Sequence, residues 1–371
     1  MNEQITVLGI GKLGLCFSLT LEESGYSVLG VDIKQEYVDS INEKRYKTAE
    51  PGVIEKLSKS KNFKATTSLS EGINYSNVIF IVVATPSLDN GRYDHSQVDS
   101  VCEQIIALGK QATKKHLVIC CTVMPKYTDS LYERVKDYNY TVSYNPEFIA
   151  QGTILKDQKS PDMVLIGEGS KEAGDMLELI YKRHTDSNPT ICRMKPIEAE
   201  ITKISLNCFL TTKIAFANMV GDISIASGGN PDVILNAIGS DTRVNKKYLK
   251  YGFGFGGPCF PRDNRALGIY ALDIGSPAEI SKATDIANSM HLIEQVKLFD
   301  NRNKTNKHNV YKIDGVSYKK GSTILEESQQ LKYAVEIAKL GYKVLIQDCE
   351  EVIEKVKKDY GNLFTYEKKD N

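Results

Sequence analysis

Short apolar runs alternate with amphipathic segments through the first half of the chain. The apolar runs span residues 5–9, 27–32, 78–84, 116–122 and 140–144. Between them, segments such as 13–24 and 97–110 carry apolar residues at helical spacing. Strands that alternate with helices indicate parallel β-α-β units. The pattern therefore predicts an α/β protein whose first domain, residues 1–195, is a doubly wound sheet.

The pattern changes after residue 195. Residues 198–226 have apolar positions at helical spacing with few breakers, which predicts a long helix. We expect a central helical domain over residues 196–300, in which the glycine-rich stretch 251–261 is a loop.

Strand character returns near the C-terminus. After a polar linker at 301–308, strands are predicted at 309–316 and 343–347, on either side of a helix at 328–340 with Gly341 as its C-cap. The charged end of the chain predicts a helix and a tail. These elements predict a small C-terminal α/β domain over residues 301–371.

Composition narrows the choice of partners. Lys plus Arg and Asp plus Glu both number 47 in the 371 residues, so the formal net charge is zero. A neutral chain is not expected to capture nucleic acid or an anionic membrane electrostatically. The N-terminus has no signal-peptide pattern, and no uninterrupted apolar stretch approaches the roughly 18 residues that span a bilayer. We expect a cytoplasmic protein with no nucleic-acid or membrane partner.

The cysteines and histidines do not form a metal-binding pattern. The eight cysteines are scattered without a CxxC pair, and the five histidines do not cluster with them at ligand spacing. In a chain of this size they predict reduced, mostly buried thiols and no metal site.

A glycine-rich turn follows the first predicted strand and opens a helix. The turn is a GxGxxG motif, in which glycines allow the tight turn, close approach to a pyrophosphate and helix–strand packing. The next strand ends in Asp32, near the spacing expected for a ribose-binding acid, which favours NAD over NADP. The alternative is a glycine-rich turn that binds another phosphate ligand. The predicted cofactor-binding residues here are Gly9, Gly11, Lys12, Leu13, Gly14 and Asp32.

Thr85 and Thr122 each follow a later strand and lie close to a proline. Ligands of such sheets bind at the carboxyl ends of the strands, so both threonines are candidates for the cofactor site. The alternative is ordinary turn chemistry next to proline.

The most informative segment is 252–263, GFGFGGPCFPRD. Its glycines let backbone amides crowd a ligand, and Cys259 is followed four residues later by Asp263. A helix that begins near Phe260 would favour the thiolate form of Cys259 at its N-terminus. The alternative is a buried cysteine in a glycine-rich turn.

This segment resembles the cysteine motif of the UDP-glucose/GDP-mannose dehydrogenase family. Further family-like segments follow in the expected order, and together they cover residues 1 to about 348. The NPEF sequence at 145–148 is more similar to UDP-glucose 6-dehydrogenases than to the branches that act on N-acetylated sugars. The other segments are 9–14, 152–153, 161–162, 166–167, 203 with 207, 243 with 247–250, and 315–319 with 327–328.

The resemblance implies oxidation of the C6 alcohol of a nucleotide sugar to a carboxylate with two NAD, such as UDP-glucose to UDP-glucuronate for polysaccharide biosynthesis. Asp263 would be the first base, through a water held with Thr122. Cys259 would capture the aldehyde as a thiohemiacetal, which is oxidised to a thioester. Glu147 would assist hydrolysis as a general base; a surface-loop acid is the alternative for this residue.

Lys203 and Asn207 lie four residues apart on the predicted long helix, and therefore on one face. The resemblance implies that they donate to the oxyanion of the tetrahedral intermediates. The alternative is a solvated lysine beside a packing or capping asparagine.

The resemblance also implies a set of substrate-binding residues. Arg243 resembles an arginine that reaches the substrate from a neighbouring subunit, which implies a homodimer or higher oligomer. The implied substrate-binding residues are Phe148, Gln151, Lys203, Asn207, Arg243, Tyr248, Lys250, Phe255, Gly256 and Lys319.

Two positions depart from the family pattern, and the C-terminal domain is abbreviated. Gln151 replaces a second glutamate, and Glu326 replaces an arginine that can contact the cofactor. The identities of the nucleotide base and the sugar in the substrate therefore stay open, and UDP-N-acetylhexosamine and GDP-mannose are the alternative substrates. Two other classes are a β-hydroxyacid-type dehydrogenase, which reduces one NAD, and a catalytically inactive nucleotide-sugar-binding protein.

Overall fold

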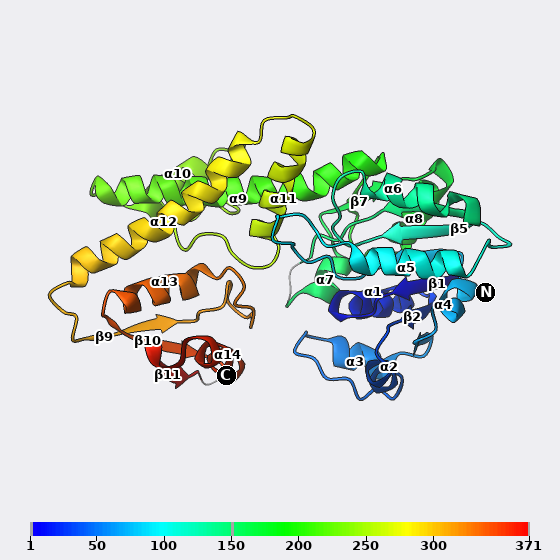
Figure 1. The fold of residues 1–371 in the computed structure, drawn as a ribbon, viewed down its shortest axis with the longest axis horizontal. Coiled ribbons are helices and arrows are strands. Elements are labelled where there is room, and N and C mark those ends of the chain that lie inside the picture. Colours follow the sequence, from blue (N-terminus) through cyan, green and yellow to red (C-terminus); the bar gives the residue numbers. More distant parts are fainter. Residues whose placement is uncertain (1–2, 150–151, 370–371) are drawn as a thin grey trace. The chain divides into compact units, whose positions relative to one another are not determined.

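The computed structural model describes residues 3–149 and 152–369. The chain forms two compact units, Met1–Lys203 and Ile204–Asn371, which are coloured from blue to green and from green to red in Figure 1.

The first unit is built on one eight-stranded sheet in the order β3-β2-β1-β4-β5-β6-β7-β8. All neighbouring strands are parallel except β6 and β7, which are antiparallel. The strands are β1 Gln4–Leu8, β2 Ser27–Val31, β3 Phe63–Thr66, β4 Val78–Ile81, β5 Lys115–Ile119, β6 Tyr140–Tyr144, β7 Met163–Gly167 and β8 Thr190–Met194. The order reverses between β1 and β4, and a ligand of such a sheet binds at this point.

Helices from two groups pack against the sheet through two separate apolar cores. One core joins the strands to α1, α2, α3, α7 and α8, and the other joins them to α4, α5, α6 and the start of the long helix α9, Pro196–Ala226. The helices are α1 Lys12–Glu23, α2 Gln35–Asn42, α3 Val53–Lys59, α4 Leu69–Tyr75, α5 Ser96–Ala107, α6 Tyr127–Val135, α7 Ile154–Lys159 and α8 Lys171–His184, with a 3-10 turn at Lys136–Tyr138. The doubly wound α/β prediction is confirmed.

Helix α9, Pro196–Ala226, begins in the first unit and continues in the second. Among the helices of residues 3–149 and 152–369, it is the one long and apolar enough, by length and composition, to cross a membrane. Its polar side chains bond to neighbouring elements of the protein. Glu200 accepts hydrogen bonds from Thr128, and Asn218 bonds to the backbone of Gly252. Such bonds are typical of a helix inside a globular core.

In the second unit, α12 crosses α9 (Figure 1), and Thr212 of α9 contacts Thr284 of α12 at 3.1 Å. Helix α10 begins after Asn230, whose side chain accepts from the Asp232 amide, with Pro231 at the first helical position. The helices here are α10 Pro231–Gly239, α11 Phe260–Asp273 and α12 Glu279–Asn303.

The chain ends in a three-stranded parallel sheet with the order β11-β10-β9. Ser328 caps α13 by accepting from the Leu331 amide. The elements are β9 Val310–Asp314, α13 Gln329–Lys339, β10 Lys343–Asp348, α14 Glu350–Tyr360 and β11 Thr365–Lys368, with a 3-10 turn at Gly361–Leu363.

Several predicted boundaries are wrong. The predicted linker at 301–308 overlaps the end of α12, and the loop predicted to reach residue 261 ends where α11 begins at Phe260. The charged tail contains a strand, β11, because its alternating pattern pairs with β10. Strands β3, β7 and β8 were not predicted.

Candidate active site

The glycine-rich turn between β1 and α1 has the backbone geometry of a phosphate site. A Cβ on Gly9, whose φ is +86°, would lie 2.5 Å from the Val82 carbonyl oxygen, and one on Gly14 would lie 2.0 Å from the Gly9 oxygen. The first and third glycines are therefore required by packing. Gly11, by contrast, faces open space and caps α1 without a side-chain hydrogen bond. The amides at this helix start can therefore receive a pyrophosphate.

Three other predicted cofactor residues lie in or beside this turn. Asp32 directly follows β2, and its carboxylate accepts from the Lys34 amide at 3.3 Å. Lys12 pairs with the buried carboxylate of Glu50 at 3.6 Å, while Leu13 is partly exposed. Glu50 in turn accepts from the amides of Gly152 and Ile154, so it ties the glycine-rich turn to the start of α7. The residues present fit a dinucleotide.

The structure brings the two predicted threonines together. The Thr85 hydroxyl donates to the Thr122 carbonyl at 2.7 Å. The loop after Thr122 is held at two more points: His95 Nε2 accepts from the Met124 amide, and Glu200 accepts from Lys126 and Thr128. Burial raises the pKa of Glu200 to about 7, against the lowering effect of these hydrogen bonds.

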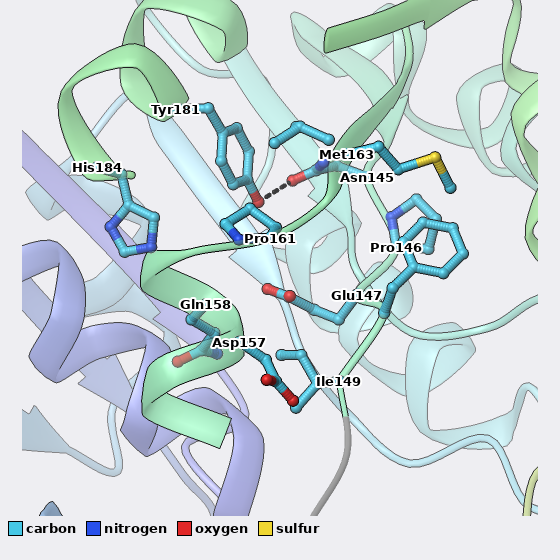
Figure 2. A pocket seen from close by; sticks show the side chains of 12 residues that line it. Asn145, Pro146, Glu147, Ile149, Asp157, Gln158, Pro161, Met163, Tyr181 and His184 are labelled. Carbon is cyan, nitrogen blue, oxygen red and sulfur yellow. Dashed lines mark hydrogen bonds between the residues drawn. The ribbon is translucent and has the colours of Figure 1, made fainter. Parts of the chain in front are cut away.

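Glu147 follows β6 and lines a narrow pocket (Figure 2). Burial raises the pKa of its carboxyl to about 7, and the nearby cation of Lys203 opposes this rise. Lys203 Nζ donates to the Glu147 backbone oxygen at 2.5 Å and lies 4.4 Å from the centre of the Phe148 ring. A carboxyl that titrates near neutrality suits a general base.

In the second unit, Cys259 is the N-cap residue of α11, and its side chain is exposed. This contradicts the alternative of a buried cysteine in a turn. An accessible thiol at a helix start has the surroundings of a reactive cysteine. The other seven cysteines are buried or half-buried.

Asp263 lies one turn into α11 and is fully buried. Its carboxylate accepts from the Asn207 amide at 2.6 Å and from Arg262 Nε at 2.8 Å. Asn207 therefore contacts the predicted base as well as being a candidate oxyanion donor.

Polar side chains of α9 and α12 hold the glycine-rich loop that precedes Cys259. Asn218 accepts from the Gly252 amide at 3.0 Å, and Asn288 pairs with both the amide and the carbonyl of Phe255 at 2.9 Å. His291 lies 2.7 Å from the Gly252 carbonyl and 2.7 Å from the Asp222 carboxylate. The loop is therefore fixed at several points although it has no regular secondary structure.

The turn before α13 supports the same loop from the C-terminal side. The Gly257 amide donates to the Glu326 carbonyl at 3.0 Å. A Cβ on Gly256 would lie 2.3 Å from the Glu327 oxygen, and one on Gly257 would lie 2.4 Å from the Tyr318 ring. Glu326 stands where the family pattern has arginine. Its backbone thus helps to hold the glycine-rich loop 252–258 before Cys259, which we call the thiol loop.

The remaining predicted substrate residues differ in exposure. Arg243 is exposed and pairs with Asp241 at 2.7 Å. Tyr248 is exposed, Lys250 lines a separate hollow, Phe255 is buried, and Lys319 lies 5.8 Å from the Tyr318 ring centre. Gln151 lies outside the described residues.

Family models match most of the chain. The NAD binding domain of the UDP-glucose/GDP-mannose dehydrogenase family matches residues 3–185, and the central domain of that family matches residues 197–290. The chain belongs to the UDP-glucose/GDP-mannose dehydrogenase family. It is therefore a member of a family of NAD-dependent nucleotide-sugar dehydrogenases, and the predicted NAD cofactor is confirmed.

Relatives within the UDP-glucose/GDP-mannose dehydrogenase family act on different sugars. A GDP-mannose 6-dehydrogenase of Pseudomonas putida is 31% identical over 93% of this chain and 80% of that protein. A UDP-glucose 6-dehydrogenase of Pseudomonas aeruginosa is 29% identical over 93% of this chain and 78% of that protein. The structure of a UDP-glucose dehydrogenase from Pyrobaculum islandicum superposes with a TM-score of 0.89 at 28% identity, covering 100% of this chain and 87% of that one.

Several residues that hold the loops of the candidate site were not predicted from the sequence. Glu50, Glu200, Asn218 and His291 each bond to a loop that carries predicted site residues. Two of them lie on the apolar helix α9, where a polar residue at a buried helical position is a signal for such a role.

Proposed function

We propose that the protein oxidises the C6 alcohol of a nucleotide sugar to a carboxylate in two NAD-dependent steps, with Cys259 as covalent nucleophile. The observation that carries the proposal is the exposed thiol of Cys259 at the start of α11, one turn before buried Asp263 and its partner Asn207. Bound at the turn Gly9–Gly14 and beside Asp32, Thr85 and Thr122, NAD would supply the oxidant, one molecule for each oxidation.

In the first oxidation, the Asp263 carboxylate receives the proton of the sugar hydroxyl, through a water held with Thr122. The Cys259 thiolate then adds to the aldehyde carbon and forms a thiohemiacetal. Its oxyanion needs hydrogen-bond donors. Asn207 has a second amide N–H besides the one given to Asp263, and the Lys203 ammonium is a further donor.

Oxidation of the thiohemiacetal gives a thioester on Cys259. Glu147 takes a proton from the water that attacks the thioester carbon, the C–S bond breaks, and the thiolate returns. The pKa of Glu147, raised to about 7 by burial, suits a base that is charged before and neutral after this transfer.

For the substrate we propose UDP-glucose, converted to UDP-glucuronate for polysaccharide, with Phe148, Gln151, Arg243, Tyr248, Lys250, Phe255, Gly256 and Lys319 as the binding residues. The 0.89 TM-score with a UDP-glucose dehydrogenase supports it. The 31% identity with a GDP-mannose 6-dehydrogenase favours GDP-mannose as the second candidate. We keep the three-domain division at residues 195 and 300 as part of this proposal.

The test is a steady-state comparison of UDP-glucose, GDP-mannose and a UDP-N-acetylhexosamine, with the NADH formed per acid product counted. Two NADH per uronate are expected, with UDP-glucose the preferred substrate. One NADH per product would reject the double oxidation. Preference for GDP-mannose would reject UDP-glucose as the substrate but would leave the double oxidation standing.

We also propose a cytoplasmic homodimer. Phe209, Phe216 and Ile223 repeat every seven residues along α9 and are 63%, 45% and 59% exposed. This spacing places them on one face of the helix, and an exposed apolar stripe fits a second copy of the chain. Light scattering should give the dimer mass for the wild type and a lower mass for Phe216→Asp, whereas an unchanged mass would reject this interface.

A further inference from the structure

A small cavity in the first unit lies between the Glu147 carboxyl and the His184 ring. In Figure 2 the carboxyl points away from its own backbone, toward the side of the pocket where Gln158 and His184 lie. The cavity volume is about 20 Å³. A cavity that holds one water molecule needs a volume of roughly 10–15 Å³. The cavity therefore has room for one water molecule.

His184 presents an acceptor to this cavity. The ring is fully buried, and Nε2 has no hydrogen-bond partner among the residues that the structure describes. The ring contacts the backbone of Thr20, and its Nδ1 lies 3.5 Å from Ser24 Oγ, so we assign the ring proton to Nδ1. Burial lowers the pKa of His184 to about 3, with a further lowering by Lys159. The neutral ring that donates from Nδ1 keeps a lone pair on Nε2.

Glu147 presents a second acceptor to the same cavity. Lys203 donates to the backbone oxygen of Glu147, and the half-buried side chain of Glu147 brings its carboxylate to the lining of the cavity. Two acceptors that face one space cannot bond to each other. For the fully buried His184 Nε2, the cost of having no donor is roughly 1–3 kcal/mol. A group that donates two hydrogen bonds would satisfy both acceptors.

We propose that the cavity binds one internal water, which donates one hydrogen bond to the Glu147 carboxylate and the other to His184 Nε2, so that His184 is a positioning residue for Glu147. The role in catalysis rests on the proposed function, in which Glu147 is the base of thioester hydrolysis. Gln158, which also lines the cavity, has an amide that can donate to the water oxygen.

The water would satisfy both protonation states of Glu147. The charged carboxylate accepts from the water, which stabilises the charged form against burial. Once Glu147 holds the proton of the attacking water, its O–H donates to the internal water, which still donates to His184. His184 therefore fixes the direction of the carboxyl without exchanging a proton.

The first test follows the titration of the Glu147 carboxyl in the resting protein, by ¹³C NMR of glutamate-labelled enzyme, assigned with Glu147→Gln. The charged and titratable groups that face Glu147 or His184 are Lys203, Asp157, Cys120, Tyr181, Lys159 and Asp186. They stay unchanged in the comparison of wild type with His184→Phe and His184→Gln.

His184→Phe removes the acceptor, so the water loses a partner and the Glu147 midpoint should rise by about one pH unit. His184→Gln places an acceptor near the Nε2 position and should return the midpoint close to that of the wild type. An equal midpoint in all three proteins would overturn the proposal, because a merely structural histidine would alter stability alone.

The second test needs no variant. A high-resolution neutron structure of the wild type should show one water within hydrogen-bond distance of both the Glu147 carboxyl and His184 Nε2. A cavity without that water would refute the proposal even if His184→Phe failed to fold. Neither test uses turnover, so one NADH per product would reject the proposed function while leaving the water site standing.

Discussion

Replacing Glu147 by glutamine should abolish efficient hydrolysis and, above neutral pH, stabilise the protein. Burial raises the carboxyl pKa from its ordinary 4.5 to about 7. A folded-state pKa above the unfolded one means that folding favours the proton. The stability from this group is complete below pH 4.5 and is lost as the pH rises through 7. At roughly 1.4 kcal/mol per unit, the loss amounts to about 3 kcal/mol.

Glu147→Gln has no charge to bury, so it should lack this loss. The free energy of unfolding, measured by urea denaturation, should favour the variant over wild type by about 2–3 kcal/mol more at pH 8 than at pH 5. The exposed carboxylate Glu36 provides the control, since Glu36→Gln should show no such difference. An advantage that is the same at both pH values would refute the reasoning. The variant should also lose roughly 10²–10⁴-fold in turnover, with acyl-enzyme visible by intact-mass spectrometry.

Four further variants test the rest of the site. Cys259→Ser should allow at most a slow first oxidation and should not complete the second oxidation to the uronate normally. If this variant turned over at the wild-type rate, covalent catalysis would be excluded. Lys203→Ala should lower kcat more than it raises KM, because its contact is proposed to strengthen in the transition state. Asp32→Ala should weaken the use of NAD more than the use of NADP, which the ratio of the kcat/KM values for the two cofactors measures. Glu200→Ala leaves the buried amide and hydroxyl of Thr128 without their acceptor, so thermal unfolding should report a loss of about 2–4 kcal/mol.

The apolar runs predict the central strands well and the others poorly. Strands β1, β2, β4, β5 and β6 are almost entirely buried, and most of their residues are apolar. Strand β11 has the sequence TYEK at a sheet edge and is mostly exposed. Strand β3 has four residues that alternate between buried and less buried positions. Edge strands bury too little to need an apolar run, so this criterion misses them. Strand β7, with the sequence MVLIG, is an inner strand with a buried apolar run, and its edge position cannot explain why it was missed.

The residues that we propose to carry the chemistry stand in sequence motifs, whereas the residues that hold them do not. Glu50 is a lone acid in a polar stretch, yet it accepts from the Ile154 amide 104 positions away in the sequence. Glu200 similarly accepts from Thr128, 72 positions away. A buried carboxylate that accepts backbone amides depends on where the chain folds back, and local spacing contains no information on that. The motifs indicate the proposed reacting groups, and the fold supplies the residues that support them.

The thiol loop shows why such supports are needed. A glycine-rich segment loses more backbone entropy on folding than other residues do, and here no strand or helix compensates for that loss. Asn288 replaces a strand partner by pairing with both the amide and the carbonyl of Phe255. One ring nitrogen of His291 lies on the Asp222 carboxylate and the other on the Gly252 carbonyl, each at 2.7 Å. The glycines before Cys259 thus require polar side chains on α9 and α12 to hold one loop conformation. The position of the proposed nucleophile therefore depends on residues that have no proposed part in the chemistry.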